Sequence, residues 1–138
     1  MKPINYNTAK KEEYLPMDIL SGMIYYMPTE KSLGTIGDIH SRIYKIKKDY
    51  KLLDNFPFST KGISPVSDEL GKTIFDLMFL RGIYPGPFVM GKGEKIKIRE
   101  GFKKYIENKV LPLFNEEELK QLKEMANDYV KVASKYVK

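Results

Sequence analysis

The hydrophobic period of this chain departs from helical spacing in one segment, and this departure constrains the fold more than any other sequence feature. Before residue 82 the apolar residues recur at helical spacing, and after residue 101 they do so again. Between these regions, residues 95–99 read "KIKIR", an alternation of charged and apolar side chains, and residues 91–94 form a glycine-rich turn before it. The pattern predicts a β-hairpin with strands at residues 88–90 and 95–99, inserted into an otherwise helical chain.

Two helices are predicted in the first third of the chain. The first lies within residues 15–28 and begins at Pro16, because proline suits the first position of a helix. The second lies within residues 29–53. Thr35 can cap it, and Asp38 lies three residues further on, in the electropositive first turn.

A third helix follows the run "SPVSDEL" at residues 64–70. We expect Ser64 to cap it, Pro65 to take the first helical position and Gly82 to end it. Residues 84–87, "YPGP", then predict a rigid turn toward the hairpin. The apolar residues of this helix recur at spacings of three and four, and additional ones widen the stripe, so we expect more than half of its circumference to be buried. They are Leu70, Ile74, Leu77 and Met78, widened by Phe75, Phe79 and Leu80.

The C-terminal part is also helical. Residues 102–114 predict a helix interrupted near Pro112, and residues 115–138 a long helix capped by Asn115 and Glu118. The long helix carries an apolar seam that can pack on its own domain or pair with a second copy, and we favour a homodimer. The seam consists of Leu119, Leu122, Ala126, Tyr129, Ala133 and Tyr136.

This order of elements predicts a mainly α-helical α+β fold with a small β-hairpin, the layout of a winged helix-turn-helix protein. We expect a flexible arm at residues 1–14, the winged-helix domain at residues 15–101, and C-terminal helices for packing or dimerisation at residues 102–138.

Short motifs in the chain resemble a family of short, largely uncharacterised winged-helix proteins of bacteria, archaea and mobile elements. That family shows the pattern F-x-F, then G-P-Y-S-x-E-L, then L-x-x-L-x-x-x-G, then a hairpin. In this chain Phe58 precedes the second motif, Ser64 and Val66 replace its Gly and Tyr, and "LMFLRGI" follows at residues 77–83. The matching residues of the second motif are Pro65, Ser67, Glu69 and Leu70. The resemblance covers about residues 17–100 and implies DNA binding or regulation, without catalytic residues.

The positive charge is concentrated in two segments. The chain carries a net charge of +6, and residues 36–62 and 90–105 each hold six basic residues against three and two acidic ones. Such segments can hold backbone phosphates, so the sequence predicts binding to double-stranded DNA, with Ser67, Lys72 and Thr73 exposed beside the groove. The expected phosphate contacts are Arg42, Lys45, Lys48 and, less centrally, Lys47 on the second helix, and Lys92, Lys95, Lys97 and Arg99 on the hairpin. The plain alternative is that these lysines only solubilise an exposed strand edge.

A second functional reading is a protein-binding module on a winged-helix scaffold, without DNA binding. It is favoured by the wide apolar stripe of the third helix and by Asp68 and Asp76, which phosphates would repel. The chain has one histidine, His40, and no cysteine, so we expect no enzyme, metal site or cofactor. No stretch is apolar enough for a membrane span or a signal peptide, so we expect a cytoplasmic protein.

Overall fold

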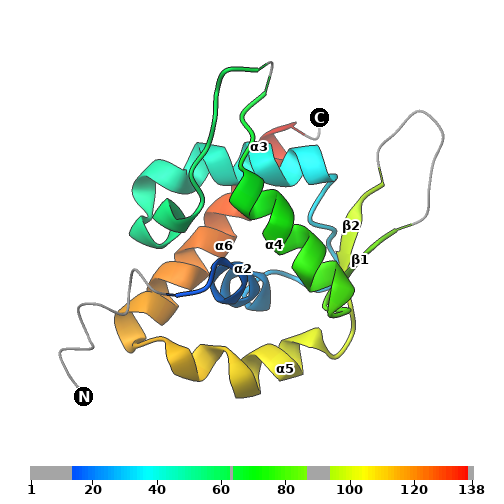
Figure 1. The fold of residues 1–138 in the computed structure, drawn as a ribbon. Coiled ribbons are helices and arrows are strands. Elements are labelled where there is room, and N and C mark those ends of the chain that lie inside the picture. The colour runs from blue at the N-terminus through cyan, green and yellow to red at the C-terminus, as the bar shows by residue number, and fades with distance from the viewer. Residues whose placement is uncertain (1–13, 63, 87–93, 137–138) are drawn as a thin grey trace.

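The computed structural model describes residues 14–62, 64–86 and 94–136, with side chains to residue 133. In these ranges the chain is mainly helical and contains one two-stranded antiparallel sheet (Figure 1). The expected combination of helices and a small hairpin is therefore confirmed. None of the helices in the described ranges is long and apolar enough to cross a membrane.

Helix α2 (Pro16–Tyr25) lies at the centre of the molecule. It packs against α4, α5 and α6, and its residues 19–24 are all buried (Figure 1). Pro16 takes the first helical position, as predicted. A Cβ atom at Gly22 would come within 2.7 Å of a methyl group of Leu122, so the glycine allows α6 to approach closely.

Helix α3 (Ile36–Ile46) begins with the predicted cap. The Thr35 hydroxyl accepts a hydrogen bond from the Asp38 amide, and the Asp38 carboxylate accepts one from the Thr35 amide, each at 3.0 Å. Two short 3-10 turns follow, η1 (Lys47–Asp49) and η2 (Lys51–Asn55). They lead into the loop whose Phe56 is fully buried.

Helix α4 (Asp68–Phe79) begins three residues later than the motif predicted. The expected cap at Ser64 is wrong, because Val66 pairs with Ser59 in an antiparallel bridge and holds the chain extended up to that point. Ser67 caps the helix instead, and its hydroxyl accepts a hydrogen bond from the Leu70 amide at 3.1 Å.

The other end of α4 closes in a Schellman motif. The amide of Gly82 donates to the Leu77 carbonyl at 2.8 Å, and the amide of Arg81 to the Met78 carbonyl at 3.0 Å. The left-handed position is occupied by Arg81, with φ of 66°, and not by the glycine. Gly82 is needed for space, because a Cβ there would lie 2.6 Å from the ring of Phe102.

The hairpin pairs β1 (Ile83–Pro85) with β2 (Ile96–Ile98), so that Ile83 lies opposite Ile98. The first strand therefore includes Tyr84 and Pro85, and the predicted turn at these residues is wrong. Proline is tolerated because β1 is an edge strand. The strand expected at residues 88–90 lies outside the described residues.

The other edge of β2 is paired as well. The amide of Leu33 donates to the Ile96 carbonyl at 2.7 Å, and the amide of Ile96 donates to the Gly34 carbonyl at 2.8 Å. The segment between α2 and α3 thus fixes the hairpin to the helical core.

Helix α5 (Phe102–Lys109) and the short turn η3 (Leu111–Leu113) precede α6 (Glu116–Tyr136). The predicted cap of α6 is confirmed, because the side chains of Asn115 and Glu118 each accept a hydrogen bond from the other residue's amide. The interruption near Pro112 is confirmed by η3, which contains it.

The apolar seam of α6 faces the core of its own domain. Leu122, Ala126 and Tyr129 are buried, and the Tyr129 hydroxyl donates to the Leu33 carbonyl at 2.6 Å. These three side chains are not available to a second copy, which corrects the expectation that they form a dimer interface. Leu119 and Ala133 are half-buried, and the Tyr136 side chain lies outside the described residues.

Candidate protein-binding surface

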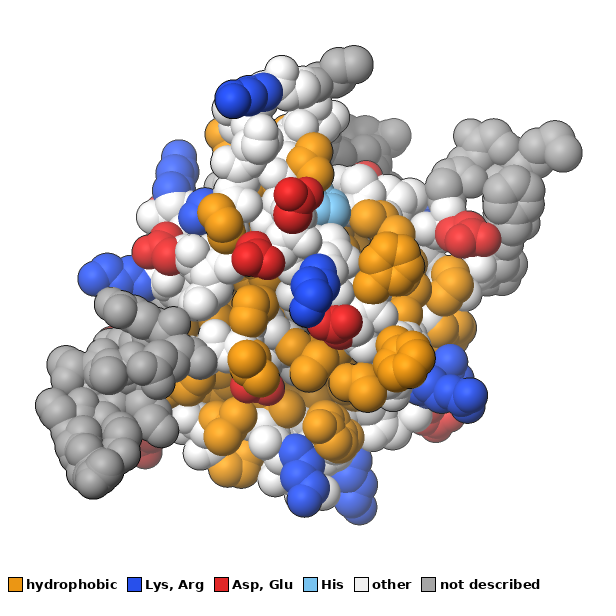
Figure 2. Space-filling model, viewed as in Figure 1, with side chains coloured by type: hydrophobic (Ala, Val, Ile, Leu, Met, Phe, Trp, Pro, Cys, Tyr) orange, Lys and Arg blue, Asp and Glu red, His pale blue; other side chains and the backbone are white. Residues whose placement is uncertain are grey.

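The outer face of α4 carries large apolar side chains in contact with solvent. Phe75 is 67% exposed, Phe79 86% and Leu80 56%. The expectation that they widen a buried stripe is therefore wrong. Thr73 and Leu77 turn toward the core, and Phe75 and Phe79 project from the opposite side of the same helix. Figure 2 shows hydrophobic side chains gathered over this face, from α4 toward α5.

Three residues spaced four apart form a row along this face, which we call the α4 ridge: Gly71, Phe75 and Phe79. Gly71 is half-exposed, and a Cβ atom there would meet only the His40 ring, at the ordinary contact distance of 3.8 Å. The ridge therefore consists of one flat position followed by two projecting phenyl rings.

Opposite charges lie at the two ends of the ridge. Asp68 and Glu69 are exposed in the first turn of α4, and Arg81 and Arg99 are exposed beyond its last turn. None of these four forms an ion pair within the described residues. Arg99 instead stacks on the Tyr84 ring, with the guanidinium carbon 4.7 Å from the ring centre. The charged groups at each end of the ridge are therefore available to another molecule.

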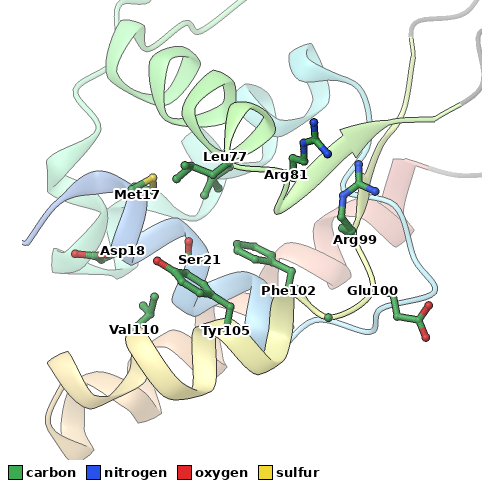
Figure 3. Close-up of a pocket in the computed structure, with 12 residues that line it drawn as sticks. Met17, Asp18, Ser21, Leu77, Arg81, Arg99, Glu100, Phe102, Tyr105 and Val110 are labelled. Atoms are coloured by element: carbon green, nitrogen blue, oxygen red, sulfur yellow. The ribbon is translucent and has the colours of Figure 1, made fainter.

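A pocket of about 420 Å³ opens beside the ridge, between α2, α4 and α5. Its walls are mostly apolar, and Leu80 connects it to the exposed face of α4. Figure 3 shows the Arg81 and Arg99 side chains at one end, pointing away from Ser21 and Tyr105. The apolar lining is formed by Met17, Leu77, Leu80, Phe102, Tyr105 and Val110.

Two polar groups of α2 also line this pocket. Ser21 is 2% exposed, and its hydroxyl has no hydrogen-bond partner among the described residues. Burial raises the pKa of the Asp18 carboxyl above its ordinary value, and Asp18 has no ion pair in the described ranges. The pocket can therefore hold an apolar group that also donates a hydrogen bond. This pocket could not be predicted from sequence patterns, because its walls come from segments far apart in the chain.

Two residues expected beside the DNA groove are buried. Ser67 is 1% and Thr73 4% exposed, and the Thr73 hydroxyl donates to the Glu69 carbonyl at 2.7 Å. Because Ser67 caps α4 and Thr73 faces the core, the expectation that both are exposed is wrong. Lys72 is exposed, and its ammonium lies 3.7 Å from the Asp76 carboxylate.

Arg42 was expected to contact a DNA phosphate, but its guanidinium contacts other groups of the same chain. It is half-buried, its guanidinium donates to the Leu33 carbonyl at 3.0 Å, and it stacks on the Tyr129 ring with its guanidinium carbon 5.6 Å from the ring centre. A 3.7 Å ion pair with Asp38 adds to these contacts. Arg42 therefore ties α3 and α6 to the strand-like segment at residues 33 and 34.

The remaining predicted cations lie in two separate regions. Lys45 is exposed on α3 and Lys48 on η1, and Lys95 and Lys97 are exposed on the hairpin. Ile96 and Ile98, which alternate with these lysines, are buried. Lys47 lies 3.6 Å from Asp54, and Lys92 lies outside the described residues.

His40 is a structural residue. It is buried, with Nδ1 3.0 Å from the Ile36 carbonyl and Nε2 3.1 Å from the Ser67 carbonyl. The ring therefore joins α3 to the residue that caps α4. Within the described ranges, no three acidic or histidine side chains lie close enough together to hold a metal ion.

Comparisons with protein-family models, with curated proteins and with solved structures gave no match.

Proposed function

We propose that this chain is a protein-binding module, and that α4 presents its binding surface. The observation that carries the proposal is the exposure of Phe75 and Phe79 on the ridge, next to an apolar pocket. Contiguous exposed apolar surface is costly in water and is typical of interaction sites. The charges at the two ends add orientation, because they favour a partner with basic groups near Asp68 and acidic groups near Arg81.

The scaffold that we propose is a winged helix. The order of α2, α3, α4 and the hairpin supports this assignment, and so does the bridge between Gly34 and Ile96, which ties the segment before α3 to the other edge of β2. In such a fold α4 corresponds to the helix that reads DNA. Here its outward side chains are phenyl rings and acidic groups, which suit a protein surface better than base edges or phosphates.

Site-specific photo-crosslinking tests the proposal. A photoreactive phenylalanine analogue replaces Phe79 on α4 in one variant and the exposed Lys123 on α6 in a control variant. We expect a discrete protein adduct at position 79 in expressing cells, identified by mass spectrometry, and none at position 123. If position 79 gives no adduct above the control, the α4 surface does not bind a protein.

Duplex DNA binding through the hairpin is a second candidate. It is supported by Lys95 and Lys97, which are exposed and form no ion pair within the described residues. It predicts affinity for random duplex DNA that falls steeply as salt rises, because each phosphate contact releases a counterion. Fluorescence anisotropy of the Lys95→Glu, Lys97→Glu variant tests it.

The matched control for this test is the Lys120→Glu, Lys123→Glu variant, which makes the same change of charge on exposed positions of α6. DNA binding through the hairpin requires that the first variant lose most of its affinity while the control keeps it. Equal losses in both variants would mean that only the net charge matters.

A further inference from the structure

We propose that the pocket between α2, α4 and α5 binds a small, neutral aromatic molecule with one hydrogen-bond donor, of the indole or phenol type. This inference goes beyond the protein-binding function proposed above and does not depend on it. The pocket volume of about 420 Å³ lies within the range of small-molecule sites, ~300–1,000 Å³. The class of ligand follows from a buried hydroxyl, an aromatic wall and the balance of charges around the pocket.

The Ser21 hydroxyl marks the polar end of the pocket. It is 2% exposed and has no hydrogen-bond partner among the described residues, whereas buried hydroxyls normally have one. In Figure 3 the Ser21 side chain points from α2 toward Leu77 of α4. Asp18 lies three residues earlier, on the same side of α2, and its carboxylate also accepts hydrogen bonds. A ligand that donates one hydrogen bond therefore satisfies this end of the pocket.

Helix α5 supplies an aromatic wall. Phe102 and Tyr105 lie one turn apart, and their rings are nearly parallel, with 12° between the ring planes and 6.2 Å between the ring centres. Met17 of α2 and Leu77 of α4 add apolar side chains without rings to the lining. Because aromatic rings attract one another beyond the effect of the area that they bury, this wall favours an aromatic ligand over an alkyl chain.

The charges around the pocket favour a neutral ligand. Two acidic residues, Asp18 and Glu100, balance two basic ones, Arg81 and Arg99. Figure 3 shows both arginine side chains pointing away from Ser21. A charged ligand would leave water without meeting a net opposite charge, and desolvation of an uncompensated charge is costly.

Indole tests the site directly, because the chain contains no tryptophan and the fluorescence of indole has no tryptophan background. Addition of the protein should raise the fluorescence anisotropy of indole, with a Kd on the order of 100 µM. Indene has nearly the same shape but lacks the N–H group, so it should displace indole about fivefold less effectively. An anisotropy that does not change with protein concentration, or equal affinities for indole and indene, overturns the proposal.

Ser21→Ala tests the hydroxyl. The affinity for indole should fall about fivefold, and the affinity for indene should stay unchanged. The ligand-free variant should have a higher Tm, because the change removes a buried hydroxyl without a partner and alanine favours a helix. Equal losses for the two ligands, or a lower Tm, would show that Ser21 supports the fold and would overturn its role in binding.

Tyr105→Ala tests the aromatic wall. Tyr105 is 52% exposed, so the fold should tolerate the change, and we expect the affinities for indole and indene both to fall about tenfold. The matched control is Tyr44→Ala, because Tyr44 is 40% exposed on α3 and does not line the pocket. Equal affinities of the two variants would place indole elsewhere on the molecule and overturn the site.

Two further probes test the class of ligand. N-acetyltryptophanamide presents the indole ring on a peptide backbone, and tighter binding of this probe would assign the pocket to a partner's side chain and overturn a free ligand. An indole that carries a propionate chain adds a negative charge, and tighter binding of this probe would overturn the preference for a neutral molecule. Weaker binding of both probes than of indole supports the proposal.

The crosslinking experiment distinguishes failure of this inference from failure of the proposed function. Phe79 does not line the pocket. A protein adduct at position 79 without indole binding keeps the protein-binding function and overturns the small-molecule site. Indole binding without an adduct keeps the small-molecule site and overturns the protein-binding function.

Discussion

Helices α6 and α4 carry similar apolar patterns but use them in opposite ways. In α6 the seam residues Leu122 and Tyr129 are buried against α2 and α3. In α4 the core-facing side is equally well buried, but Phe75 and Phe79 add a second apolar side that contacts solvent. The comparison shows that apolar spacing identifies a face that needs a partner, without showing whether that partner lies in the same domain.

The largest expected difference in the free energy of unfolding is between the substitution of one residue in α6 and of one residue in α4. Leu122→Ala removes a fully buried side chain beside Gly22 and leaves a cavity, so we expect a loss of about 2–5 kcal/mol in the free energy of unfolding. Phe79→Ala removes an exposed ring and should change the free energy of unfolding of the monomer by less than about 0.5 kcal/mol. Chemical denaturation at low protein concentration measures both values, and similar losses would remove the distinction between the two helices.

The start of α4 provides a smaller test of how the ridge is held. Ser67→Ala removes the hydroxyl that accepts the Leu70 amide, so we expect a loss of about 1 kcal/mol. Ser64→Ala is the matched control and should have almost no effect, because Ser64 is exposed and does not cap the helix. A larger loss of stability for Ser64→Ala than for Ser67→Ala would indicate that Ser64 caps α4, as the motif predicted.

The end of α4 provides a test of opposite sign. Arg81 has a φ of 66°, a conformation that glycine adopts more easily, so Arg81→Gly should stabilise the monomer by up to about 1 kcal/mol. Thermal unfolding measures this change, and a destabilised variant would contradict the left-handed position of Arg81.

The smallest effect concerns the pocket beside the ridge. Burial raises the pKa of Asp18 in the folded state, so the folded protein binds a proton more readily there than the unfolded chain does. The carboxylate therefore costs stability above this raised pKa, and that cost disappears as the pH falls below the unfolded value. Asp18→Asn should accordingly be stabilising near neutral pH and without effect in strong acid. A variant with an unchanged pH profile of stability would show that Asp18 is well solvated.

Much of the helical framework could be predicted from local sequence signals. Thr35 with Asp38 and Asn115 with Glu118 were identified as caps because both partners lie within one turn of each other. The start of α4 was misplaced because "SPVSDEL" contains two serines that can cap. The choice between them depends on the bridge from Val66 to Ser59, a contact that no local pattern reveals.

The functional surface could be predicted only in part. The excess of apolar residues in α4 was visible, but which of them face outward depends on how α2, α3 and the hairpin pack around that helix. Likewise, Arg42 resembled the other cations of its segment, and only the structure shows that it binds the Leu33 carbonyl. Charge and hydrophobicity can be read from a sequence, whereas their availability depends on tertiary contacts.

Cysteine cross-linking tests the α4 surface most directly, because the chain has no cysteine of its own. Single cysteines at Phe75, at Phe79 and at the control position Lys123 are labelled with a photoreactive maleimide, and each labelled protein is irradiated in a lysate of expressing cells. The proposed function predicts a discrete protein adduct at positions 75 and 79, identified by mass spectrometry, and only background at position 123. The same background at all three positions would show that α4 does not bind a protein.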